Sequence, residues 1–136
     1  MDTLMALRHA KEAGAKVLAI CNTNSSTIPR ESDAVIYTHA GPEIAVASTK
    51  AFLTQVVATY LIGLYLGQAV GTLSERQIEA LYNEMLELPA KIEQILETVE
   101  PLRELTRSFA DSSSVLFLGR HVGYPVALEG ALKLKE

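Results

Sequence analysis

Short apolar runs alternate with amphipathic stretches along this chain of 136 residues. Apolar positions recur at helical spacing in residues 2–13, and Gly14 follows as a typical helix-ending residue. Two runs rich in β-forming residues, 16–21 and 34–39, lack polar alternation. Such runs predict strands buried on both faces of a parallel sheet. Residues 114–119 predict a third strand of the same kind.

Longer helical patterns occupy most of the remaining sequence. Residues 51–70 predict a long apolar helix that is capped by Ser48 or Thr49. Ser74 and Gln77 form the pattern of a capping box, which predicts the start of the next helix. Prolines mark the starts or interruptions of later helices, at Pro89, Pro101 and Pro125. This order of helices and strands predicts an α/β fold with a mostly parallel sheet.

The apolar stretch 51–70 also has the length of a membrane span, which needs about 20 residues. Polar side chains interrupt it, two glycines lower its helix propensity, and no excess of Lys or Arg marks either end. These features favour a buried helix in the core of a protein without contact to a membrane.

Composition narrows the function classes further. The net charge is −4 and no basic run stands out, which argues against nucleic-acid binding. Cys21 is the only cysteine, so no internal disulfide forms, as is usual in the cytoplasm. No spacing of Cys and His suggests a metal site. His39 and His121 follow predicted strands and are candidates for ligand contact.

Ligands of parallel sheets bind beyond the carboxyl ends of the strands, and three loops take that place here. Residues 22–33 are rich in hydroxyls, which suits either a phosphate site or, more often, a polar surface loop. Residues 39–48 lead into the start of the long helix. The free N–H groups at that start would either face a ligand or only bond to a capping side chain. Lys50 lies in the first turn of that helix, where positive charge is mildly unfavourable, which hints at another role such as pairing with Glu43. The third loop is 119–125.

The closing segment places three charged residues, Glu129, Lys133 and Glu136, within about 60° of one another on a helix. Apolar residues surround most of this stripe, which predicts a buried helix whose charges are paired. A carboxylate beside a lysine in an apolar cleft suits proton transfer. A solvated, ion-paired face is the alternative.

Two long segments carry a resemblance to a known family. "AICNTNSSTIPRESDAVIYTHAGPEIAVASTKAF" and "LFLGRHVGYPVALEGALKLKE" resemble the isomerase part of the glucosamine-6-phosphate synthase family. The resemblance implies a three-layer α/β fold, a parallel sheet flanked by helices, of the sugar-isomerase (SIS) type, here incomplete. It places residues 1–100 in the later part of a first SIS subdomain with its connecting helices. Residues 101–136 would start the second.

The resemblance also implies a reaction and its residues. The family makes glucosamine 6-phosphate from fructose 6-phosphate and ammonia released from glutamine. By this resemblance Glu136 is the base that moves a proton between C1 and C2, and Lys133 belongs to the same network. Val46 and Ser48 contact the sugar, and Glu129 is a possible member of the network. No metal or organic cofactor is implied.

The family's phosphate-binding loop would precede Met1, and its ring-opening histidine would follow Glu136. We therefore expect an internal fragment that is inactive alone, from a cytoplasmic homodimeric enzyme with a glutaminase domain in the same chain. Two alternatives remain open. One is another SIS-fold sugar-phosphate isomerase or deglycase, and the other is a non-catalytic sugar-phosphate sensor.

Overall fold

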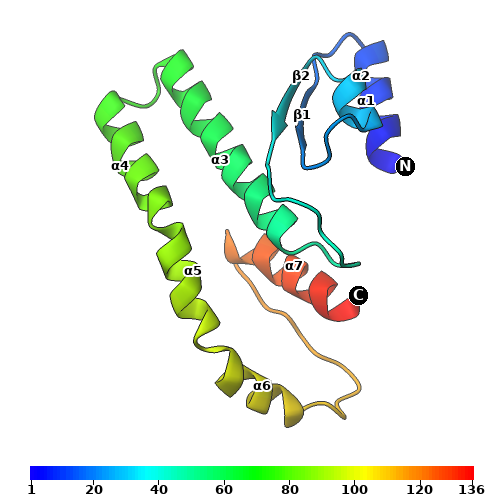
Figure 1. Ribbon diagram of the computed structural model, residues 1–136, viewed down its shortest axis with the longest axis vertical. Coiled ribbons are helices and arrows are strands. Elements are labelled where there is room, and N and C mark those ends of the chain that lie inside the picture. The colour runs from blue at the N-terminus through cyan, green and yellow to red at the C-terminus, as the bar shows by residue number, and fades with distance from the viewer. The chain divides into compact units, whose positions relative to one another are not determined.

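The computed structural model describes residues 1–136, and Figure 1 labels their helices and strands. The chain divides into two compact units. The first unit holds Met1–Leu66 together with Glu136, and the second holds Gly67–Lys135. The division falls inside a long helix, whereas the sequence predicted a subdomain boundary near residue 100. That boundary stays a prediction, and each unit is described by itself.

The first unit is built around a parallel pair of strands. Its elements are α1 Asp2–Glu12, β1 Leu18–Cys21, α2 Thr27–Glu31, β2 Ala34–Tyr37 and the first part of α3, which spans Lys50–Val70. β1 and β2 pair in parallel, with Leu18 opposite Ala34 and Cys21 opposite Tyr37. The helix–strand alternation and the parallel pairing predicted from the sequence are confirmed.

Polar contacts tie α1 to α2 and to the start of β2. The guanidinium of Arg8 donates two hydrogen bonds to the carboxylate of Glu31, at 2.8 and 2.7 Å. Lys11 donates to the backbone oxygen of Glu31 at 2.8 Å. The backbone N–H of Val17 donates to Asp33 at 2.9 Å. These contacts, together with the buried side chain of Leu7, hold the helices against the strand pair.

The strands are less buried than their apolar sequence predicts. Ala19 is the only buried residue of β1, Leu18 is 46% exposed, and β2 has no buried residue. The prediction of burial on both faces is therefore wrong for this chain. Two strands and two short flanking helices supply too little apolar surface to cover both faces of a sheet.

Helix α3 has the predicted extent but not the predicted burial. Its length and composition would allow it to cross a membrane, and 11% of its most apolar window is buried. Only Ala51, Ala58 and Leu64 are buried, so a helix fully covered by this chain is not observed. Core helices of soluble proteins have the same length and hydropathy. That α3 belongs to a protein core stays a prediction.

The second unit is helical and contains the end of α3. Its other elements are α4 Glu75–Leu86, α5 Leu88–Leu96, α6 Val99–Arg107 and α7 Gly123–Lys135. The predicted capping box is present: Ser74 accepts a hydrogen bond from the N–H of Gln77, whose side chain accepts one from the N–H of Ser74. Pro89 lies in the first turn of α5, as its interruption of the helical pattern predicts.

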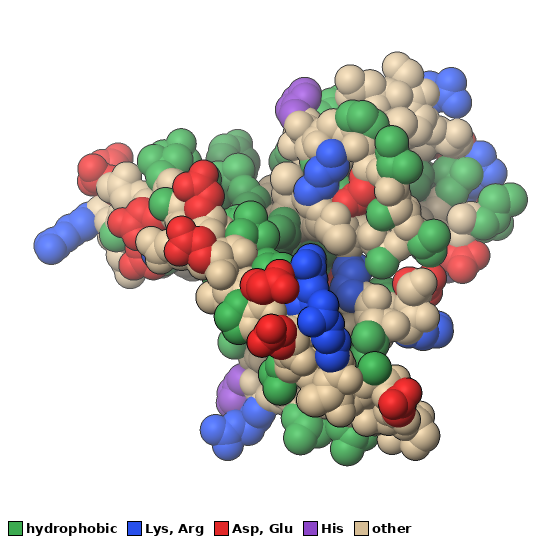
Figure 2. Space-filling model, turned by 60° about the horizontal axis from the view of Figure 1, so that its bottom comes forward, with side chains coloured by type: hydrophobic (Ala, Val, Ile, Leu, Met, Phe, Trp, Pro, Cys, Tyr) green, Lys and Arg blue, Asp and Glu red, His purple; other side chains and the backbone are tan.

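The predicted third strand, 114–119, is absent. These residues form no strand or helix, and Leu116 and Leu118 are 82% and 88% exposed. A strand needs a neighbour to receive its backbone hydrogen bonds, and nothing in this chain pairs with this one. Helix α7 also has no buried residue, so the prediction of a buried helix is wrong here. Figure 2 shows hydrophobic side chains lying at the surface among charged ones of both signs.

Candidate functional site

The loop between β2 and α3 carries Val46 and Ser48, the predicted sugar-contacting residues. Asn22, directly after β1, holds the start of this loop with three hydrogen bonds. Its side-chain oxygen accepts from the hydroxyl of Thr38 at 3.0 Å and from the N–H of Ala40 at 2.8 Å, and its amide donates to the oxygen of Gly41 at 2.7 Å. One side chain therefore joins the carboxyl ends of both strands.

Glu43 holds the other end of the same loop. Its carboxylate accepts hydrogen bonds from the hydroxyl of Ser48 at 3.1 Å, the N–H of Thr49 at 2.8 Å and the hydroxyl of Thr49 at 2.7 Å. The hydroxyl and N–H of Thr49 are the main cause that lowers the pKa of Glu43 to about 2, and Ser48 and the N–H of Ala51 add to it. The carboxylate is thus ionised at neutral pH.

This arrangement changes two expectations for the helix start. The N–H of Thr49 is bonded to Glu43, so this N–H does not face open space. Lys50 forms no ion pair with Glu43, and that prediction is wrong. The negative carboxylate instead bonds to the N-terminal end of α3, where the helix dipole is positive.

Between the two fixed ends, the middle of the loop presents its side chains outward. Ile44 is 99% exposed and Val46 is 84% exposed, whereas Ser48 is half-buried. An exposed apolar side chain on a loop that is anchored at both ends is suited to ligand contact. Contact of Val46 and Ser48 with sugar stays a prediction.

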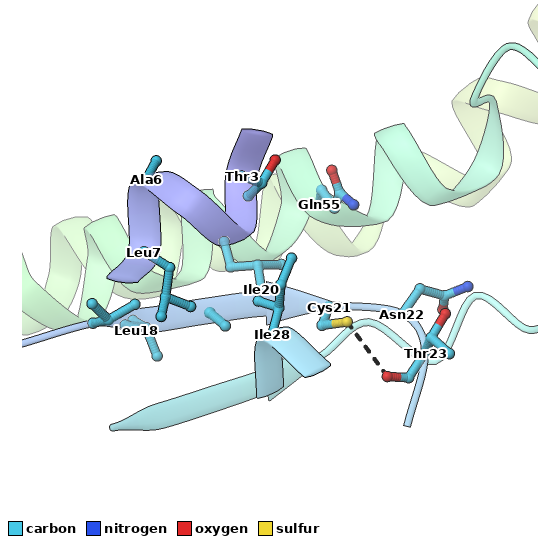
Figure 3. Close-up of a pocket in the computed structure, with 12 residues that line it drawn as sticks. Thr3, Ala6, Leu7, Leu18, Ile20, Cys21, Asn22, Thr23, Ile28 and Gln55 are labelled. Carbon is cyan, nitrogen blue, oxygen red and sulfur yellow. Dashed lines mark hydrogen bonds between the residues drawn. The ribbon is translucent and has the colours of Figure 1, made fainter. Parts of the chain in front are cut away.

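A cavity of about 660 Å³ lies in the first unit, along one side of β1. Its walls are mostly apolar and come from α1, β1 and α2, with Gln55 of α3 and Thr3 of α1 adding polar groups (Figure 3). From the hydroxyl-rich loop 22–33, the polar side chains that line it are those of Asn22 and Thr23. The hydroxyl of Ser26 donates within the loop, to the backbone oxygen of Thr23 at 3.0 Å. At least one hydroxyl of this loop therefore stabilises the turn of the loop itself.

Helix α7 carries the predicted charged stripe. Glu129 and Lys133 form an ion pair, and their side chains are 25% and 27% exposed. This i,i+4 pair was predicted from the spacing and is confirmed. Glu136 follows the last residue of α7 and is exposed. Its role as a base, and the membership of Lys133 and Glu129 in a proton-transfer network, stay predictions.

A left-handed backbone conformation occurs in all three loops that the sequence predicted to be ligand-binding. Ser25, His39 and His121 have φ angles of 60°, 53° and 54°. Such values are uncommon outside glycine and concentrate at functional sites. His39 also lies near the ring of Tyr37, with ring centroids 6.3 Å apart. The two histidines are candidates by their place in these loops, but no residue pattern predicts the left-handed conformation.

Comparison with known proteins identifies the class. A family model for the SIS domain matches residues 1–65. These residues contain the parallel strands, the Asn22 and Glu43 contacts and the start of α3. The fold is that of a SIS domain.

Relatives with high identity extend over the whole chain. The isomerizing glutamine–fructose-6-phosphate aminotransferase of Streptomyces coelicolor is 67% identical over 136 residues, which is 100% of this chain and 22% of that protein. The enzyme of the same name from Mycobacterium tuberculosis is 63% identical over 99% of this chain and 22% of its own length.

A solved structure agrees in fold. The C-terminal domain of glucosamine-fructose-6-phosphate aminotransferase from Francisella tularensis matches 99% of this chain and 38% of its own, with a TM-score of 0.96 and 40% identity. Over its whole length the chain is similar to the SIS region of isomerizing glutamine–fructose-6-phosphate aminotransferases. It spans about a fifth of the length of the curated relatives that it matches.

Proposed function

We propose that this chain is the part of a glutamine–fructose-6-phosphate aminotransferase that binds the sugar phosphate and isomerises it. The observation that carries the proposal is the 67% identity to an enzyme of that name along all 136 residues. The anchored loop with Val46 and Ser48 and the Glu129–Lys133 pair support it, because they offer a sugar contact and a proton-handling pair.

The proposed chemistry is a proton transfer on an aminated ketose. Ammonia replaces the C2 carbonyl oxygen of fructose 6-phosphate, which leaves as water, and forms an imine. The carboxylate of Glu136 then takes a proton from C1, while the imine nitrogen gains one, and an enamine results. Return of the first proton to C2 and loss of the C1 hydroxyl proton give the aldehyde of glucosamine 6-phosphate. No redox step occurs, so this chemistry calls for no redox cofactor.

Glu129 and Lys133 have supporting roles in this proposal. The ion pair holds the Lys133 ammonium one helical turn from Glu129. A fixed cation near the reacting carbons stabilises negative charge that develops on oxygen in the transition state. Val46 and Ser48 orient the sugar.

The remaining parts of the reaction belong to the longer protein. We propose that the complete enzyme is a cytoplasmic homodimer whose glutaminase domain, in the same chain, supplies ammonia. The phosphate-binding loop and the ring-opening histidine lie outside these 136 residues in this proposal.

A chimera tests the function directly. The matched segment of the Streptomyces coelicolor enzyme is replaced by this chain, and glucosamine 6-phosphate formation is measured with and without Glu136→Gln. We expect the parent chimera to be active and the variant to lose about 10²–10⁴-fold in kcat, the usual contribution of a general base. Glu97→Gln, at an exposed position away from the site, serves as the control and should keep full activity.

Retention of kcat within threefold in Glu136→Gln would refute the assignment of the base. An inactive parent chimera that is folded and still binds fructose 6-phosphate would instead favour a sugar-phosphate sensor.

A further inference from the structure

The hydrogen bond between Ser48 and Glu43 has a defined direction. An ionised carboxylate has no proton, so the hydroxyl of Ser48 is the donor over the 3.1 Å between its Oγ and Oε2 of Glu43. The pKa of Glu43, lowered to about 2, keeps the carboxylate ionised throughout the neutral range. A serine hydroxyl has a single proton, and here that proton is already used.

The remaining capacity of Ser48 is therefore to accept. Its oxygen keeps lone pairs that are directed away from Glu43, and the side chain is half-buried. A ligand group that meets this oxygen must bring its own proton, as a sugar hydroxyl does. An ether or carbonyl oxygen at the same place would face a second acceptor without a proton between them.

We propose that Glu43 is a positioning residue which commits Ser48 to accept a hydrogen bond from a sugar hydroxyl, and so sets both the orientation and the specificity of sugar binding. The inference rests on the proposed function, because Ser48 is the sugar contact there. Glu43 thereby has a second role besides stabilising the start of α3. The N–H of Thr49 is already bonded to Oε1, whereas the Ser48 bond uses Oε2.

The two roles of the carboxylate are separable by mutation. Its bonds to Thr49 stabilise the start of α3, and its bond to Ser48 fixes the polarity of the site. Gln at position 43 keeps the size of the side chain but turns one oxygen into an NH₂ donor. Such an amide is able to donate to Ser48, which would free the serine proton and remove the bias toward accepting.

A double-mutant cycle in the chimera described above tests the proposal. Glu43→Gln, Ser48→Ala and the double variant are assayed for KM and kcat with fructose 6-phosphate. We expect each single variant to raise KM about tenfold with little change in kcat, since one hydrogen bond of ground-state binding is lost. The double variant should match Ser48→Ala within twofold, because Glu43 acts through Ser48.

Two controls separate positioning from general stability. Thr49→Val removes the hydroxyl that bonds Oε1 and leaves the Ser48 bond, so KM should stay within twofold. Glu31→Gln weakens the surface pair with Arg8 in the same unit and should also leave KM unchanged. If Glu43→Gln does not fold, Glu43→Asp replaces it in the cycle, because its shorter side chain withdraws the carboxylate from Ser48.

Each outcome decides the proposal. If the double variant raises KM about a hundredfold, the two tenfold effects of the single variants multiply. Glu43 then acts independently of Ser48, which refutes the positioning role and leaves the proposed function standing. A KM within twofold in Glu43→Gln would refute the positioning role as well. A normal KM in Ser48→Ala would remove the sugar contact and with it both the inference and that part of the proposed function.

Discussion

At the scale of a residue, the hydrogen bonds within one loop change the pKa of Glu43. Three donors from Ser48 and Thr49 surround one carboxylate at the start of a helix. Each donor stabilises the ionised form, so the pKa falls to about 2 although the group is not enclosed. The loop that carries Val46 is thereby anchored by a charge that persists at all ordinary pH values.

The pH dependence of this anchor has a definite sign. Because the pKa of Glu43 is lower in the folded chain than the ordinary value of 4.5, its contribution to stability is complete above pH 4.5 and is lost as the pH falls toward 2. We expect the carboxyl ¹³C NMR signal of Glu43 to titrate near pH 2. In Thr49→Val the midpoint should move upward, since the Thr49 hydroxyl is the largest cause of the shift. A midpoint near 4.5 in the unmodified chain would contradict the observed hydrogen bonds.

At the scale of an element, local signals in the sequence define where several helices begin and end. The capping box of Ser74 and Gln77 starts α4, and Pro89 falls in the first turn of α5. Gly14, with a φ angle of 84°, follows the end of α1. Each signal acts through backbone groups within one turn, so it works whatever lies around the helix.

Replacing Ser74 with Ala tests the local character of the α4 start. Loss of the capping hydrogen bonds should destabilise the first turn by about 1 kcal/mol. Amide hydrogen exchange there should accelerate about fivefold, because local opening becomes that much more frequent. Ser113→Ala, in an exposed segment without regular structure, is the control and should change nothing. Unchanged exchange in the first turn of Ser74→Ala would show that packing and not capping starts this helix.

At the scale of the whole molecule, the chain leaves much apolar surface uncovered. The buried apolar residues are few: Leu7, Ala19, Pro29, Ala51, Ala58 and Leu64. Many large apolar side chains of α3, α7 and residues 114–119 are exposed. Exposed apolar area on this scale is typical of surfaces that pack against other protein. The chain spans about a fifth of its relatives, which is consistent with such packing.

The proposed function also predicts how the chain behaves by itself. Incubated with fructose 6-phosphate and ammonia, the 136-residue chain should form no glucosamine 6-phosphate above background, whereas the chimera should. In the proposed function, the phosphate-binding loop and the ring-opening group are supplied by other parts of the enzyme. Turnover by the isolated chain, measured by a chromatographic assay for the product, would show that these 136 residues hold a complete site.

Contacts between residues close in the sequence were easier to predict than contacts between distant ones. The Glu129–Lys133 pair was predicted because i,i+4 residues meet on any helix. The contacts of Asn22 with Thr38 and Gly41 were not, because they join loops that only the parallel pairing brings together. The role of Glu43 was also missed. Its partners lie five and six residues ahead, and a loop conformation selects them in preference to Lys50.

The amino-acid sequence by itself predicted the helices, the two paired strands, their parallel class and the similarity to SIS-domain proteins, since these depend on local periodicity, capping and motif content. Only the tertiary structure decided which apolar runs are covered and whether the predicted third strand forms. Residues 114–119 have the composition of a strand yet form none, because backbone pairing requires a neighbour that no local pattern supplies. For the same reason the hydrogen bonds that orient Ser48 became visible only once the loop was folded against α3.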